Sequence, residues 1–245
     1  MKKSLFLICL LALATSVFAQ DEEKSNIIFD GASYSFMFSW KKKPVKSHWT
    51  GLEFAFSNLD GLNKENVNLK LNRSHSFKLN LIDYNVFTHY SYSNWLFFTG
   101  LGFEWSLFNF KGNTGLRDDD AGITRFLPDH EGRSYRSNKL FVDYVTVPLM
   151  LEYQKKIREN RTFFISGGIE GLICVYSKSK VEARTPNGIK KISYKDLNIF
   201  PFNFRTVLRT GFENFSFFGY YQPCSMFQKG KGPELRSWGI GVSIH

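Results

Sequence analysis

The chain has 245 residues, a net charge of +10 and a mean hydropathy of −0.25, and 17% of its residues are aromatic. This length suits one domain or one modest barrel. Beyond the N-terminal segment, no stretch reaches the ~18 uninterrupted apolar residues of a transmembrane helix. A basic balance can indicate nucleic-acid binding, but an exported chain has little access to nucleic acid, so we expect no such partner.

Residues 1–19 have the organisation of a secretory signal peptide. Lys2 and Lys3 precede an apolar core, and Val17 and Ala19 are small residues at the positions that a signal peptidase prefers. We therefore expect export of the rest of the chain across the inner membrane.

A lead-in follows the signal and connects it to the main domain. We expect residues 20–47 to form a periplasmic or interfacial segment and residues 48–245 to form the domain itself. Aromatic residues alternate with small ones within 32–40, so an additional strand there stays an open alternative.

In the main domain, apolar and polar residues alternate with a period of two, and this pattern predicts eight β-strands. The hairpin within 140–175 is the clearest case, since each of its strands exceeds the ~9–11 tilted residues that cross a bilayer. A phase slip at Ile82 predicts a β-bulge. The expected strands lie near 48–57, 76–88, 95–108, 144–153, 163–175, 200–212, 215–222 and 235–245.

The connections between these strands alternate between long and short, and residues 213–214 form a two-residue turn. Long outer loops and short periplasmic turns are typical of outer-membrane barrels. We therefore predict an all-β fold, an eight-stranded antiparallel up-and-down transmembrane β-barrel in the outer membrane of a Gram-negative cell. A soluble periplasmic β-sandwich is the alternative.

The aromatic residues near the strand ends fit this prediction. We expect Trp49, Trp95 and Tyr153 near the inner ends and Trp105 and Trp238 near the outer ends, because amphipathic rings prefer the headgroup level.

Charged residues on the polar faces of the strands would fill the lumen. An eight-stranded barrel has an interior just wide enough for side chains, and a buried charge needs a partner. The sequence therefore predicts an internal network that plugs the lumen, with a proton or ion relay as the alternative. Its expected members are Glu53, Glu104, Glu152, Glu170, Arg205 and Arg209.

The expected loop 177–199 is strongly basic and contains a turn at Pro186. Its cations are candidates for contact with the phosphates of anionic glycolipid, or form a solvated face. These residues are Lys178, Lys180, Arg184, Lys190, Lys191 and Lys195.

No recognised catalytic or metal-binding motif is present, and we expect no enzyme activity, cofactor or metal. His75 beside Ser74 or Ser76, and His130 beside Asp129 or Glu131, are the only candidate pairs of base and partner. The run 118–120 of three aspartates lacks the spacing of a calcium loop. The sequence leaves open whether Cys174 and Cys224 form a disulfide.

Four segments resemble small outer-membrane β-barrel proteins of the PorT-like type common in Bacteroidetes. They are YVTVPLMLEY at 144–153, FFISGGIEGLI at 163–173, HWTGLEFAF at 48–56 and KGKGPELRSWGIGVSI at 229–244. The resemblance implies a barrel over residues 45–245, and the family name implies an accessory role in secretion.

Three functions follow as expectations. The first is a monomeric barrel with a structural or surface-interaction role through its extracellular loops, in contact with lipid, glycolipid and possible envelope protein partners. The second is an accessory subunit of an outer-membrane secretion or assembly system. The third is a lipid-modifying barrel enzyme.

Overall fold

The computed structural model describes residues 47–65, 67–85, 94–129, 132–158, 161–186 and 188–245. All of them belong to one compact unit, Lys42–His245. Outside these residues lie the expected signal peptide, nearly all of the lead-in and the segment 32–40, for which an additional strand is an alternative. Among the described residues, no helix is both long and apolar enough to cross a membrane.

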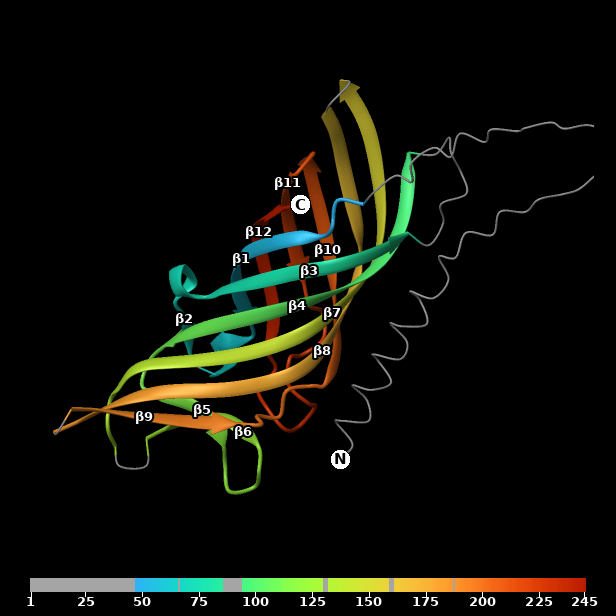
Figure 1. Cartoon of the computed structure of the whole chain (residues 1–245). Helices are drawn as coiled ribbons and strands as arrows, with labels where there is room; N and C mark the ends of the chain where they lie inside the picture. Colours follow the sequence, from blue (N-terminus) through green and yellow to red (C-terminus); the bar gives the residue numbers. More distant parts are fainter. Residues whose placement is uncertain (1–46, 66, 86–93, 130–131, 159–160, 187) are drawn as a thin grey trace, which may run out of the picture. The chain divides into compact units, whose positions relative to one another are not determined.

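Eight strands form a closed ring, which confirms the predicted up-and-down barrel (Figure 1). Each pairs antiparallel with the barrel strands before and after it in the chain, and the last pairs with the first. The strands are β1 (Gly51–Asp60), β3 (His75–Asn85), β4 (Trp95–Lys111), β7 (Tyr135–Arg158), β8 (Arg161–Thr185), β10 (Phe202–Phe212), β11 (Phe215–Tyr221) and β12 (Arg236–Ile244).

Two local predictions are confirmed. The pairing of β3 with β4 shifts register between Asn80 and Ile82, where the phase of apolar residues slips. Glu213 and Asn214 connect β10 to β11, and Glu213 has a positive φ of 48° that the tight turn requires. The long and short connections alternate as expected, so the long ones all lie at one end of the barrel, called here the outer end.

The long connections contain more regular structure than expected. The first holds η1 (Leu62–Glu65), β2 (Asn68–Leu69) and η2 (Leu71–Arg73), and the second holds a hairpin of β5 (Thr114–Asp118) and β6 (Thr124–Pro128). The prediction of a basic loop at 177–199 is also wrong. Strand β8 continues to Thr185, and β9 (Gly188–Lys195) pairs back onto it. Beyond the hydrocarbon layer no face meets acyl chains, so these strands lack the apolar contrast that revealed the others.

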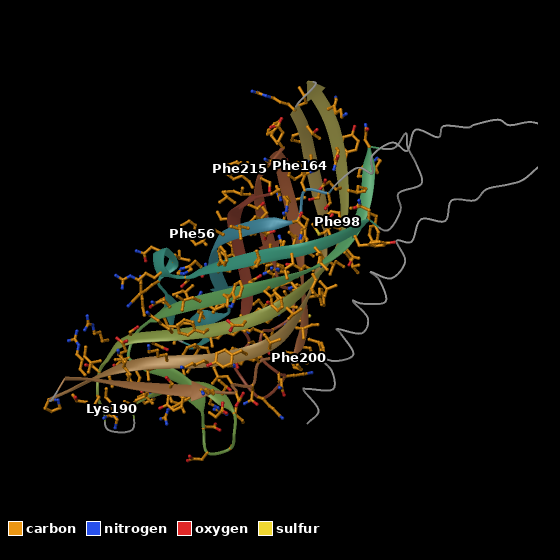
Figure 2. The ribbon with its side chains drawn as sticks, viewed as in Figure 1. Phe56, Phe98, Phe164, Lys190, Phe200 and Phe215 are labelled. Atoms are coloured by element: carbon orange, nitrogen blue, oxygen red, sulfur yellow. The ribbon has the colours of Figure 1, made fainter. Side chains whose placement is uncertain are left out.

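The outside of the barrel is apolar over most of its circumference. Leu208, Phe217 and Ile240 are each more than 60% exposed, and Phe56 and Phe215, labelled in Figure 2, also lie on the outer face. Large exposed apolar areas are rare on soluble domains. The outer faces of the strands are therefore suited to contact with lipid hydrocarbon.

The lumen is filled in three layers. An apolar cluster at the outer end includes Phe108 and Leu140, and a second cluster at the inner end includes Trp49 and Phe98. Glu104 lies between Phe98 and Phe108 on the inward face of β4, so a polar layer separates the two apolar ones. Trp49 therefore packs inside the barrel at 1% exposure, and its expected place in the interfacial aromatic belt is wrong.

Candidate functional site

The six charged residues expected in the lumen are all buried, with exposures of 0–3%. Each lies on the inward face of its strand, because alternate residues of a strand face opposite sides. Glu53 comes from β1, Glu104 from β4, Glu170 from β8, and Arg205 and Arg209 from β10. The barrel therefore brings together side chains that are up to 156 residues apart in sequence.

Five of these residues and Lys78 form a continuous chain of alternating charge. Arg205 joins Glu104 to Glu170, with its Nε 2.6 Å from Glu170 Oε2 and its Nη1 3.2 Å from Glu104 Oε1. Lys78 Nζ then joins Glu170, at 2.7 Å, to Glu53, at 2.9 Å. Glu53 pairs at its other oxygen with Arg209.

Lys78 of β3 is a member of this chain that the sequence analysis missed. It is 3% exposed and bridges two glutamates, whose like charges would otherwise repel each other within one low-dielectric layer. Its position was available from the pattern, because Lys78 lies between Phe77 and Leu79 and so on the polar face of an alternating strand.

Among the described residues, Glu152 forms no direct ion pair with the cations of this chain and is linked to Arg209 only through His48, whose carbonyl oxygen accepts from Arg209 Nη1 at 3.3 Å. Glu152 Oε1 accepts hydrogen bonds from Gln154 Nε2, at 2.6 Å, and contacts His48 Nδ1 at 2.8 Å. His48 in turn stacks on Phe164 with a centroid separation of 4.1 Å. Glu152 thus helps to close the inner end of the lumen.

Polar and aromatic neighbours complete the charged layer. Asn80 Nδ2 donates to Glu53 at 2.5 Å, and Ser106 Oγ donates to Glu104 at 2.7 Å. The guanidinium of Arg205 lies over the ring of Tyr220 at 4.4 Å. Three carboxylates face three cations in the chain, so the layer balances its formal charge and fills the cross-section.

The six basic residues of the expected glycolipid contact all lie on the β8–β9 hairpin. Strand register puts Lys178 and Lys180 opposite Lys195 and Ser193, on the outward face, together with Arg184 and Lys191. Lys190 pairs with Ala183, which is buried, and so lies on the other face of the hairpin. Figure 2 shows Lys190 at the far end of this hairpin.

The expected candidates for catalysis and metal binding are not assembled. Ser74 and Ser76 are buried, whereas His75 lies on the outer face and stacks against Phe54. Asp129 pairs with Arg133 at 2.7 Å, while residues 130–131 lie outside the described part. Within that part, no group of three potential metal-ligating side chains occurs.

The aspartates of the run 118–120 take part in the turn of the β5–β6 hairpin. Asp119 accepts hydrogen bonds from the backbone of Ala121 and Ile123, and pairs with Arg125. The two cysteines of the described region form no disulfide, and the Cys174 thiol instead donates to the carbonyl of Tyr176 at 3.7 Å.

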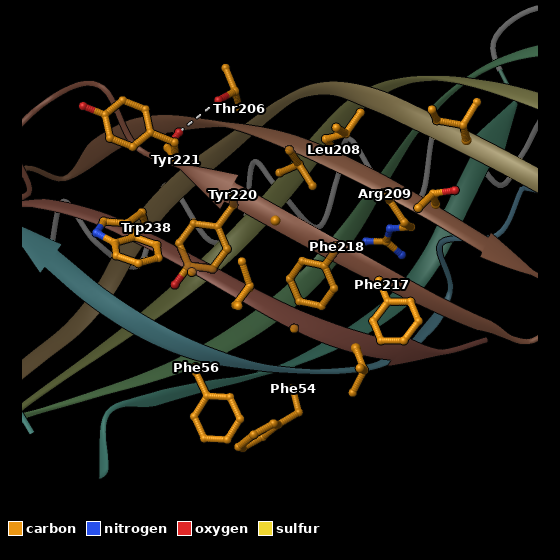
Figure 3. Close-up of a pocket in the computed structure, with 18 residues that line it drawn as sticks. Phe54, Phe56, Thr206, Leu208, Arg209, Phe217, Phe218, Tyr220, Tyr221 and Trp238 are labelled. Atoms are coloured by element: carbon orange, nitrogen blue, oxygen red, sulfur yellow. Dashed lines mark hydrogen bonds between the residues drawn. The ribbon is translucent and has the colours of Figure 1, made fainter. Parts of the chain in front are cut away.

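One hollow of about 970 Å³ lies on the exterior over β10, β11, β12 and β1 (Figure 3). It forms because Gly219 has no side chain between its register partners Leu208 and Ile240. Phe54, Phe56 and Phe217 border it, so it is an apolar depression in the lipid-facing surface rather than a polar site.

The closed ring, its apolar exterior and its filled lumen define a small β-barrel of the transmembrane type. Neither a protein-family model nor a curated protein matches the chain. Two solved structures are similar, both of Ail, the attachment invasion locus protein of Yersinia pestis, one of them in complex with the heparin analogue sucrose octasulfate. They are 12% and 11% identical, cover 79% of this chain and 95% of theirs, and have a TM-score of 0.29. Because these values are low, the assignment rests on the closed strand pairing, the apolar exterior and the filled lumen.

Proposed function

We propose that this protein is a monomeric outer-membrane barrel with a filled lumen, and that it acts through its outer surface in a structural or surface-interaction role. The apolar exterior carries this proposal. On the outer face of β4, Trp95 and Trp105 are both exposed at opposite ends of the apolar stretch. Ten residues at about 3.3 Å each, tilted by about 40°, span roughly 25 Å, the height of the apolar band of outer-membrane barrels.

The filled lumen excludes a porin-like pore from the proposal. Two apolar clusters and the charged chain occupy the interior of the described barrel. Interaction with other molecules then falls to the long outer connections and to the barrel exterior, in contact with lipid and glycolipid.

Two measurements test this proposal on the full chain extracted from membranes. Boiled and unboiled samples are compared on a detergent gel, and the folded protein is reconstituted in a planar bilayer. We expect a mobility shift on boiling and no steady conductance. Recovery in the periplasmic soluble fraction without a shift would reject the membrane barrel, and stable open channels would reject the filled lumen.

A second candidate, an accessory subunit of a secretion or assembly system, has one feature in its favour. The β7–β8 hairpin extends past its neighbours at the inner end, since Trp95 of β4 pairs with Tyr153 and Phe212 of β10 pairs with Phe163. The extension exposes Lys155, Lys156 and Ile157. The PorT-like resemblance of the sequence points to the same role.

Shortening this inner hairpin separates the two candidates. In the secretion role, the shortened protein still inserts but exported cargo accumulates in the periplasm. In the surface role, secretion is unchanged, while removal of the β5–β6 hairpin abolishes surface binding. A lipid-modifying enzyme is not favoured by any contact of the described residues, so we propose a non-catalytic role, which mass analysis of lipid A in a deletion strain tests.

A further inference from the structure

Two adjoining hollows of opposite character lie on one side of the barrel exterior, over the outer halves of β3, β4, β7 and β8. The lower hollow, of about 500 Å³, is bordered by Phe77, Trp105, Phe141 and Tyr176. The upper hollow, of about 440 Å³, is bordered by Lys70, Arg73, Arg136 and Lys139. His75 and Leu107 border both, so the two hollows are continuous.

The strand register shows how sharply this surface changes from aromatic to cationic. The first row across the strands consists of Phe77, Trp105, Asp143 and Tyr176. The next row toward the outer end consists of His75, Leu107, Phe141, Lys178 and Lys195. The row after that consists of Asn109, Lys139, Lys180 and Ser193. Two residues along a strand advance about 7 Å, so amines lie directly outside the aromatic level.

Three of these amines have stems packed against the barrel and heads without acidic partners. Lys139, Lys178 and Lys180 are half-buried, and none pairs with a carboxylate of the described residues. The acids facing this surface are Asp143 in the aromatic row and Glu182 beside the upper hollow. Long basic side chains commonly place an apolar stem on a surface and present the charge at its edge.

The opposite side of the barrel lacks this cationic surface. Just outside Trp238, the outward residues of β12 and β1 are Arg236 and Asp60, which face each other and balance in formal charge. At this level β12 and β1 are therefore balanced in charge, whereas lysines without a carboxylate partner among the described residues lie at the double hollow.

We propose that this side binds one phosphorylated glycolipid of the outer leaflet. Its headgroup phosphate lies on Lys139, Lys178 and Lys180, and an acyl chain runs inward along Phe77 and Trp105. Lysine recognises phosphate as a point charge, and aromatic rings prefer the level between headgroup and hydrocarbon. This inference rests on the proposed outer-membrane function. It adds Lys139 to the expected contacts and removes Lys190, which lies on the other face of its hairpin.

Native mass spectrometry of the full chain in detergent tests this site, with purified bisphosphorylated lipid A, its dephosphorylated form and phosphatidylglycerol as probes. The test variant combines Lys139→Glu, Lys178→Glu and Lys180→Glu. The control combines Lys155→Glu, Lys156→Glu and Lys190→Glu, which makes the same charge change away from the face. We expect one retained lipid A on wild type and control, and at least about tenfold weaker retention by the test variant, because each lost charge-assisted contact weakens binding.

The dephosphorylated lipid should bind as weakly to the wild type as lipid A binds to the test variant. Equal retention by test and control variants, or undiminished binding of dephosphorylated lipid, would overturn the site. Phosphatidylglycerol binding as tightly as lipid A would overturn the choice of a glycolipid. Lys→Gln substitutions at the same three positions replace the charge reversals if those variants lose the heat-dependent shift. A wild type that lacks the shift refutes the proposed function itself, whereas an intact shift without lipid A binding refutes only this site.

Discussion

Removal of Arg205 should destabilise the barrel more than any other single loss in the charged layer. Arg205→Met keeps much of the side-chain volume but, among the described residues, removes the only charged partner of Glu104 and one of two charged partners of Glu170. All three residues are at most 3% exposed. Removing one member of a buried ion pair costs about 3–5 kcal/mol. Of the described side chains, Ser106 then remains as the donor to Glu104.

The free energy of unfolding is measured by urea titration of the folded protein in lipid vesicles, with tryptophan fluorescence as the signal. Arg236→Met is the control, because Arg236 is an exposed residue of β12, and such changes are usually within about 0.5 kcal/mol. Adding Glu104→Gln to Arg205→Met should recover part of the loss, because the orphaned charge is removed. If Arg205→Met and Arg236→Met are equally stable, the charged chain does not hold the lumen as we describe.

Three further predictions address the exterior, the inner end and the outer loops. Leu208→Arg, at the centre of β10 on the lipid face, should lower stability in vesicles by about 2–4 kcal/mol. Leu71→Arg in η2 should change stability by less than about 0.5 kcal/mol. Equal effects of the two substitutions would contradict the assignment of Leu208 to the lipid face. Gly100→Ala should cost about 1–3 kcal/mol, because the new methyl would lie 2.5 Å from the backbone oxygen of Ile82 and 2.7 Å from the Trp49 ring. Gly167→Ala, with its nearest neighbour at 3.6 Å, should be mild in the same titration. Burial and nearby Asp129 raise the pKa of Tyr135 to about 12 from the usual 10.0. The contribution of this pKa shift to stability is therefore complete below pH 10 and is lost as the pH rises toward 12. The difference in phenolate absorbance between wild type and Tyr135→Phe should show this late transition, and a transition near pH 10 would refute the prediction.

The barrel could be predicted from sequence because the membrane imposes contrast on every strand. Each spanning strand meets lipid on one face and side chains on the other, so its residues alternate, and even the bulge at Ile82 is visible as a slip of phase. The β8–β9 hairpin was not predicted because neither of its faces meets hydrocarbon. Lys190 and Lys191 face opposite sides there, and a run of lysines carries no period.

The charged layer was predictable in membership but not in connectivity. Alternation identifies which faces point inward, and it identifies Lys78 as well as the glutamates and arginines. Which cation meets which carboxylate depends on strand stagger and on the tilt of the ring, which a single sequence does not express. Glu152 illustrates this: it has the same alternation as Glu170, but it lies nearer the inner end and meets His48 instead of an arginine.

The source of the charges along the chain has a consequence for assembly. Glu53, Lys78, Glu104 and Glu170 belong to the first five barrel strands, and both arginines come from the sixth, β10. An open sheet that ends at β8 therefore holds three carboxylates against one amine in this layer, and water must solvate the excess. The same strand, β10, supplies the two guanidinium groups and seals the edge of β8. Neutralisation of the interior therefore requires β10, so a sheet that lacks this strand has an acidic inner wall, which disfavours its collapse.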